Sequence, residues 1–188
     1  MRIIPRIFVA TLAVALMLSG CVPTTPSASR TPKASGAPVF ASEAEALAAA
    51  TKAYAAYVKV SDEILADGGA GPERINAVAT GDALAAALSG YQEFRSKEWR
   101  SVGLSRFDHV TLQRLSNSSV DGTNLAVIYV CLDVSNVDVV DRNGTSVVSP
   151  QRPARQSFQV SEDWDKVKSR LVVSSREPWT DGGVCEKP

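Results

Sequence analysis

The spacing of the apolar residues changes once along this chain of 188 residues, near Gly103. Before Gly103, apolar side chains recur every three or four residues, which is the spacing that gives a helix one buried face. After it, β-branched and aromatic residues gather in short runs that are typical of strands. This order predicts an α+β fold, in which N-terminal helices pack on an antiparallel sheet.

Three helices are expected before Gly103. Ser42 and Glu45 are spaced as a capping box, so the longest helix begins directly after Ser42. A glycine-rich stretch ends this helix, and Pro72 suits the first turn of a short second helix. Gly81 marks a break, after which Asp82 is expected to cap the third helix. The expected helices cover about residues 43–65, 72–78 and 83–99.

The strands are expected at about residues 107–115, 125–134, 157–161 and 170–175. The second of them has apolar side chains at both odd and even positions, which predicts a central strand covered on both faces. The sequence Asp141-Arg142-Asn143-Gly144 carries a hairpin turn signal.

The N-terminus has the pattern of an export signal. Arg2 and Arg6 precede an apolar stretch at 7–18, and the small residues Ser19 and Gly20 follow it. Twelve helical residues span about 18 Å, which is less than the roughly 30 Å of hydrocarbon in a bilayer. We therefore expect residues 1–20 to be a signal peptide and not a permanent membrane span.

The stretch Leu18-Ser19-Gly20-Cys21 resembles the lipobox of bacterial lipoproteins. The resemblance implies that the signal is cut before Cys21 and that the Cys21 thiol carries a diacylglycerol. Acyl chains such as palmitate would then anchor the protein at the extracytoplasmic face of the cell membrane, since two or three chains hold durably. The alternative is an ordinary cleaved signal with a free cysteine nearby.

Residues 21–41 are rich in proline, serine and threonine, so they are expected to form a disordered tether. The tether would reach about 20–25 Å from the membrane. Residues 42–188 are long enough for a single domain with one core. Without Arg2 and Arg6, 18 of the 20 basic residues remain against 20 acidic ones. This near-neutral balance argues against nucleic acid as a partner.

Lipidation of Cys21 would leave Cys131 and Cys185 as a pair in an oxidising compartment. A disulfide between them would fasten the C-terminal segment to the central strand. The alternative is two free cysteines, one of them reactive.

The order of elements resembles small lipoproteins of actinobacteria that have a nuclear transport factor two-like (cystatin-like) domain. The runs that carry the resemblance are Val130-Cys131-Leu132-Asp133-Val134, Val139-Val140-Asp141 with Gly144, Arg152-Pro153-Ala154-Arg155, and Trp179 with Cys185. The resemblance implies a strongly curved, cone-like sheet that wraps a long helix around a pocket.

Four residues are candidates for the lining of this pocket: Tyr54, Tyr57, Tyr129 and Asp133. Asp133 is a candidate general base if its strand face lines the cone, but an acid at a strand end also bonds backbone amides or Arg155. Asp108 and His109 are adjacent on a strand, so their side chains are expected on opposite faces and cannot form a simple dyad. His109 is the one histidine, so we expect no metal site and no cofactor.

Two functions remain open at this point. The favoured one is a non-enzymatic, lipid-anchored domain that binds an envelope protein or a small apolar ligand, or that takes part in envelope assembly. The alternative is a cone-pocket isomerase, cyclase or hydratase, which would need an open pocket with Asp133 or His109 in it. A lipid carrier with a wholly apolar cavity is a third possibility. The sequence does not indicate an oligomeric state.

Overall fold

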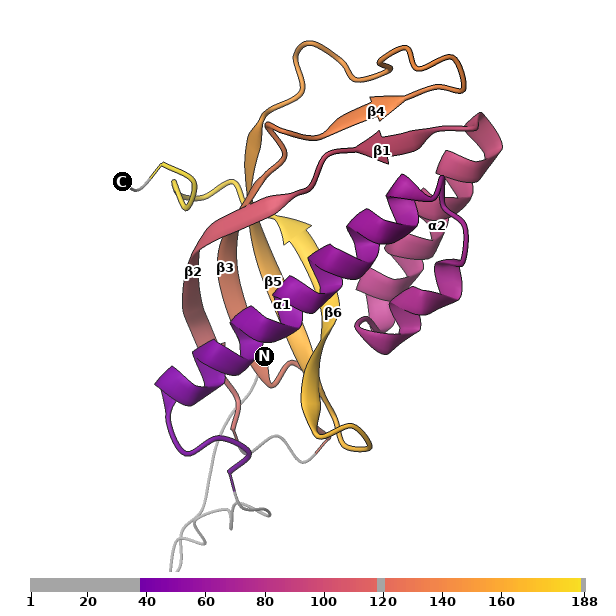
Figure 1. The fold of residues 1–188 in the computed structure, drawn as a ribbon. Helices are drawn as coiled ribbons and strands as arrows, with labels where there is room; N and C mark the ends of the chain where they lie inside the picture. Colours follow the sequence, from indigo (N-terminus) through magenta and orange to yellow (C-terminus); the bar gives the residue numbers. More distant parts are fainter. Residues whose placement is uncertain (1–37, 118–120, 187–188) are drawn as a thin grey trace, which may run out of the picture. The chain divides into compact units, whose positions relative to one another are not determined.

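In the computed structural model, the helices occupy one side of a four-stranded antiparallel sheet (Figure 1). The structure describes residues 38–117 and 121–186. The helices are α1 (Glu43–Ala66), the 3-10 helix η1 (Pro72–Ala77) and α2 (Gly81–Lys97). The strands are β1 (Arg100–Val102), β2 (Arg106–Leu115), β3 (Ala126–Asp133), β4 (Asp138–Val140), β5 (Arg155–Asp165) and β6 (Arg170–Pro178). The predicted α+β class is confirmed, and the cone-like curvature stays a prediction.

Helix α1 begins where the capping box predicts. The backbone N–H of Glu45 donates to Ser42 Oγ, and the Glu45 carboxylate accepts from the N–H of Ala41. Helix α2 instead has Thr80 as its N-cap residue, and Asp82 lies in its first turn. The Thr80 N–H donates to the Val173 carbonyl of β6, which fixes the start of α2 at the sheet.

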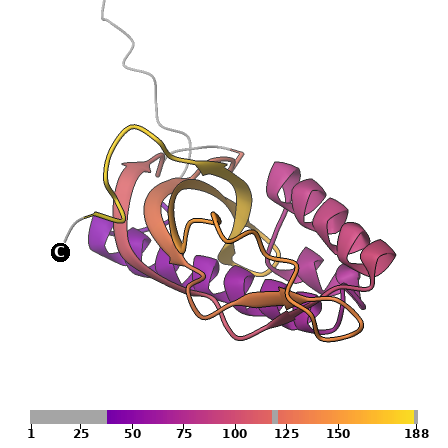
Figure 2. The same cartoon turned by 90° about the horizontal axis from the view of Figure 1, so that it is seen from above.

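The four-stranded sheet has the order β2-β3-β5-β6, and every pair is antiparallel. Strand β3 is central and largely buried, as its double-sided apolar pattern predicts. Helix α2 lies beside the β6 edge, which Figure 2 shows from above. The loop after β4 turns at Asp141, whose carboxylate accepts from the N–H groups of Asn143 and Thr145.

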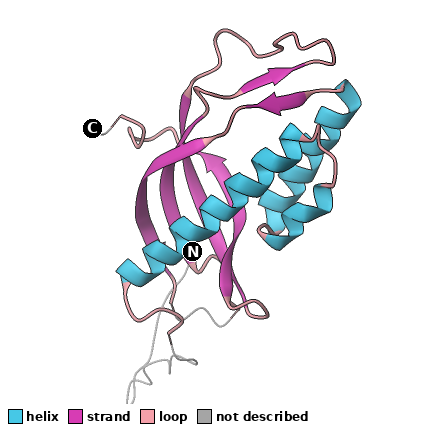
Figure 3. Cartoon of the chain, viewed as in Figure 1, coloured by secondary structure: helices cyan, strands magenta, loops and turns pink. Residues whose placement is uncertain are grey.

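Strands β1 and β4 form a separate two-stranded ribbon that the sequence pattern did not predict. The ribbon lies at one end of the sheet, next to the C-terminal half of α1 and to α2 (Figure 3). Each of its strands has only three residues, which is too short for an alternating pattern to identify a strand. The ribbon creates one wall of the cleft described below.

Helix α1 and the C-terminal segment cover opposite faces of the sheet. The α1 side holds the main core, which includes Tyr54, Ile64, Ile128, Val130, Phe158 and Val160. On the other face, the ring of Trp179 lies 4.7 Å from that of Tyr129, and Cys185 is joined to Cys131. The predicted disulfide is confirmed, and it holds the C-terminal segment on β3.

The domain begins slightly before the predicted boundary at residue 42. Phe40 is buried, its ring packs edge-on against that of Trp164, and its N–H donates to the Asn117 side chain. Residues 39 and 40, at the end of the predicted tether, therefore belong to the domain. The predicted signal peptide, the lipidated Cys21 and the remainder of the tether up to residue 37 lie outside the described residues.

Candidate functional site

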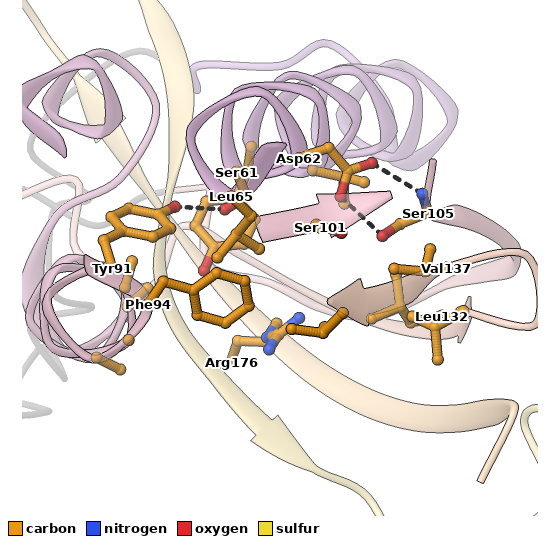
Figure 4. A pocket seen from close by; sticks show the side chains of 18 of the residues that line it. Ser61, Asp62, Leu65, Tyr91, Phe94, Ser101, Ser105, Leu132, Val137 and Arg176 are labelled. Carbon is orange, nitrogen blue, oxygen red and sulfur yellow. Dashed lines mark hydrogen bonds between the residues drawn. The ribbon is translucent and has the colours of Figure 1, made fainter. Parts of the chain in front are cut away.

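A cleft of about 500 Å³ lies between α1, α2, the β1–β4 ribbon and the ends of β3 and β6 (Figure 4). This volume is within the range of small-molecule sites. We call it the helix–ribbon cleft. Its apolar wall includes Val58, Leu65, Ala87, Phe94, Leu132 and Val137.

Each helix presents one face to the helix–ribbon cleft. Helix α1 contributes Tyr57, Ser61 and Leu65, and α2 contributes Ala87, Gly90 and Phe94 among others. Residues three and four apart lie on the same side of a helix, so both sets form continuous stripes. A Cβ atom added at Gly90 would meet no atom within 4 Å, so the middle of the α2 stripe is open space.

The side chain of Asp62 fastens α1 to the loop between β1 and β2. Asp62 is buried, and its two carboxylate oxygens accept from the N–H and the hydroxyl of Ser105, each at 2.8 Å. Both bonds are drawn in Figure 4. A buried carboxylate needs such donors, so Asp62 holds the cleft in shape.

Ser61 and Tyr91 join the two helices across the cleft, with their hydroxyl oxygens 2.7 Å apart. Burial raises the pKa of the Tyr91 phenol, and the hydrogen bond with Ser61 opposes this effect. The phenol is therefore neutral at pH 7. On the ribbon side, the guanidinium of Arg152 donates to the carbonyls of Val134 and Val137, which fixes the loop before β4.

Arg176 of β6 supplies the second guanidinium of the cleft. In the view of Figure 4, its head group lies between Phe94 on one side and Leu132 and Val137 on the other. The guanidinium carbon is 4.3 Å from the centre of the Phe158 ring, a cation–π distance. Unlike Arg152, Arg176 donates to no backbone carbonyl within the described part of the chain.

The four residues predicted to line one pocket do not come together. Tyr57 lines the helix–ribbon cleft, whereas Tyr54 is buried behind it, with its ring 5.0 Å from that of Phe107. Tyr129 and Asp133 lie on the opposite face of the sheet, because alternate residues of β3 point to opposite sides. The prediction of one shared pocket is wrong because it combined residues that lie on opposite faces of the sheet.

Asp133 has the structural role that was the alternative to catalysis. Its carboxylate accepts from the N–H of Ser135 and from the guanidinium of Arg155. The backbone bond from Ser135 is the main reason that the pKa of Asp133 is lowered, with Arg155 adding to it. A carboxylate with a lowered pKa stays ionised at neutral pH and is a weak base.

The prediction that Asp108 and His109 point to opposite faces is wrong. His109 has a φ of 53°, and a bulge interrupts the β2–β3 register between Asp108 and Thr111. The bulge brings His109 Nδ1 to 2.5 Å from Asp108 Oδ1. Arg155 also bonds Asp108, and it is the main cause of the lowered pKa of that carboxyl. The pair does not line the helix–ribbon cleft.

Three polar residues of the fold were missed by the sequence reasoning: Asp62, Glu162 and Arg176. Asp62 and Glu162 each interrupt an otherwise apolar face, at helical spacing in α1 and at every second residue in β5. An acid on an inward-facing position was the available signal. Arg176 had no such signal, because it lies near the end of β6, where a cation is ordinarily solvated.

No family model matches the chain, and no curated protein matches it. The chain is similar to the solved structure of the intermembrane space region of the chloroplast protein ARC6, with 12% sequence identity and a TM-score of 0.50. The match covers 70% of this chain and 95% of that chain. At this identity, the similarity shows a shared fold and nothing about function.

Within 38–117 and 121–186, no group of three or more His, Cys, Asp and Glu side chains is arranged to hold a metal ion. The same residues include no helix with the length and apolar character of a membrane span.

Proposed function

We propose that the chain is a lipoprotein anchored through Cys21 to the extracytoplasmic face of the cell membrane, and that its domain binds a small, largely apolar molecule in the helix–ribbon cleft. The proposed role is binding and not catalysis. The observation that carries it is the cleft itself, which has about 500 Å³ of space and a mainly apolar wall.

The polar groups of the cleft support a binding role because most of them are engaged in holding its walls. Asp62 bonds Ser105, Ser61 bonds Tyr91, and Arg152 bonds the loop before β4. Preformed walls reduce the ordering cost of binding. Neither His109 nor Asp133, the acid and base candidates of the catalytic alternative, lines the cleft.

Gly90 allows the proposed binding to be tested without removing any interaction. The domain of residues 34–188 is titrated with N-phenyl-1-naphthylamine, a neutral apolar probe whose fluorescence rises in apolar sites. Gly90→Leu places a side chain in the open part of the α2 stripe. We expect the affinity of this variant for the probe to be about tenfold or more below that of the wild type. Gly90→Ala is the matched control, and it should bind like the wild type.

The G90A variant also reports on the fold, because alanine is favoured over glycine within a helix by about 0.5–1 kcal/mol. We expect it to be slightly more stable than the wild type. Absence of probe binding, or equal binding by G90L and the wild type, would contradict a ligand site in the cleft.

The anchor is tested separately, by mass spectrometry of the full chain extracted from membranes. The expected species begins at Cys21 and carries the added mass of a diacylglycerol. An unmodified Cys21, or a chain that still begins at Met1, would overturn the anchor and leave the cleft proposal unaffected.

A further inference from the structure

Arg176 is a cation in the helix–ribbon cleft that lacks an anionic partner. It is half-buried, and among residues 38–117 and 121–186 no carboxylate forms an ion pair with it. Its guanidinium lies over the Phe158 ring, which supplies no oxyanion. A partly desolvated guanidinium is best stabilised by an oxyanion, which accepts two parallel hydrogen bonds from it.

The acids of the cleft do not supply that oxyanion. Asp62 is buried and already accepts two bonds from Ser105. Asp82 and Glu177 also line the cleft, but both are exposed at its rim. These two rim carboxylates disfavour a ligand with several negative charges. With Arg152 engaged by backbone carbonyls, one available arginine and two exposed carboxylates in the lining suit a head group with a single negative charge.

Two tyrosines also bear on this part of the cleft. Tyr57 lines the cleft, and its hydroxyl bonds no other described residue. Tyr54 is fully buried, and its hydroxyl makes no hydrogen bond of ordinary geometry. Burial raises the pKa of Tyr54, and the charge of Arg176 and a side-chain hydrogen bond with it oppose that effect, so the guanidinium lies next to the phenol oxygen.

Arg176 and Tyr57 share one chemical character, because the guanidinium and the Tyr57 phenol can each donate hydrogen bonds into the cleft. Unsatisfied donors next to a cation are an unfavourable arrangement for an empty site and a favourable one for an oxyanion. The remainder of the wall, including Leu65, Phe94 and Val137, is apolar and offers only van der Waals contact. The helix–ribbon cleft therefore has a polar, cationic spot within an apolar surround.

We infer that the ligand of the helix–ribbon cleft is an amphiphile with a singly charged oxyanion head, such as a carboxylate, and an apolar tail. Arg176 and Tyr57 bind the head, and Tyr54 supports Arg176 from behind. The tail lies along the apolar faces of α1, α2 and the ribbon. This inference rests on the proposed function, since it assigns a ligand class to the same cleft.

The test compares four probes by titration calorimetry with the domain of residues 34–188, at concentrations below those at which the probes aggregate. Decanoate, decanol and decyltrimethylammonium share a tail and differ in head charge, and acetate has the head without the tail. We expect decanoate to bind about tenfold or more tightly than decanol and decyltrimethylammonium. Acetate should bind more weakly than any of the three.

Arg176→Gln should reduce the preference for decanoate over decanol to about twofold or less, while decanol binding stays within about twofold of the wild type. Arg114→Gln is the charge-matched control, because Arg114 is exposed on β2 and does not line the cleft. It should keep the full preference. Tyr57→Phe should lower decanoate affinity and leave decanol affinity unchanged.

Each departure from this pattern has a separate meaning. Equal binding of decanoate and decanol by the wild-type domain overturns the inference and leaves an apolar binding site, even if R176Q does not fold. Tightest binding of decyltrimethylammonium, or equal binding of acetate and decanoate, also overturns it. Absence of binding by all the tailed probes and by N-phenyl-1-naphthylamine overturns the proposed function itself.

Discussion

The imidazole Nδ1 of His109 lies 2.5 Å from the Oδ1 of Asp108, although the two residues are consecutive on strand β2. The contact depends on the left-handed backbone of His109, whose φ is 53°. Arg155 of β5 bonds the same carboxylate and also Asp133 of β3. One cluster of charges thus connects three strands at the end of the sheet, and the bulge adds His109 to it.

The bulge predicts which residues position 109 tolerates. A β-branched residue is strained at positive φ, and glycine is not. We expect His109→Val to be less stable than His109→Gly by about 1–2 kcal/mol, although valine favours strands elsewhere. Urea denaturation of the two variants measures the difference. Equal stabilities would mean that the backbone at 109 is not held in the left-handed region.

The disulfide predicts a large loss of stability on its removal. Cys131 and Cys185 are 54 residues apart in sequence, and closing a loop of that length is worth about 4 kcal/mol in the chain-entropy model. We expect the double variant C131S/C185S to lose a stability of that order in urea denaturation. The C-terminal segment should also leave the sheet, which exposes Trp179 and shifts its fluorescence to the red.

The same double variant with Trp179→Phe is the control for the fluorescence change. The red shift should be absent from it, because Trp99 and Trp164 lie outside the C-terminal segment. A stability equal to that of the wild type would contradict a structural role for the disulfide.

Glu162 predicts an unusual dependence of stability on pH. It is fully buried opposite Ala126 and Val173, and its carboxyl oxygens have no hydrogen-bond partner. Burial alone raises its pKa well above the ordinary value of 4.5. Above pH 4.5 the folded state therefore holds a proton that the unfolded state releases, so the free energy of unfolding falls as the pH rises toward the pKa of folded Glu162.

Glu162→Gln cannot titrate, so it should lack this fall. We expect it to match the wild type near pH 4 and to be more stable than the wild type at pH 8, as measured by urea denaturation at a series of pH values. Glu73→Gln, at an exposed position, is the control and should show the same pH dependence as the wild type. A wild-type curve parallel to that of E162Q would contradict the raised pKa.

Gly103 predicts a link between the ribbon and the cleft. Its φ is 92°, and a Cβ atom there would lie 1.9 Å from the carbonyl oxygen of Asn136. Alanine at this position must displace the segment before β4. That segment contains Val137, which lines the cleft. We expect Gly103→Ala to cost about 1–3 kcal/mol and to weaken binding of N-phenyl-1-naphthylamine.

Gly144→Ala is the matched control for Gly103→Ala. Gly144 also has a positive φ, but the space around its Cβ position is open. The Gly144→Ala variant should therefore lose some stability through backbone strain and keep the wild-type affinity for N-phenyl-1-naphthylamine. Equal loss of affinity in both variants would show that the ribbon does not shape the cleft through residue 103.

Local patterns of sequence determined the elements that are long. Helix α1 follows from the Ser42 cap and a stripe of inward apolar residues, and β3 follows from apolar residues at both parities. The disulfide followed from counting cysteines. The helix and the strand depend on neighbours within a few residues. The disulfide depends on there being two cysteines besides Cys21. No knowledge of the tertiary arrangement is needed to predict these features.

Only the tertiary structure decided the site. The β1–β4 ribbon exists because two three-residue segments meet, and their pairing follows from the β2–β3 register and the close approach at Gly103. The bulge at His109 reverses a side chain that simple alternation places on the other face. Arg176 and Tyr57 are 119 positions apart, and they share a cleft because β6 and α1 pack together. Contacts between distant segments depend on how whole elements pack, and local periodicity does not report that.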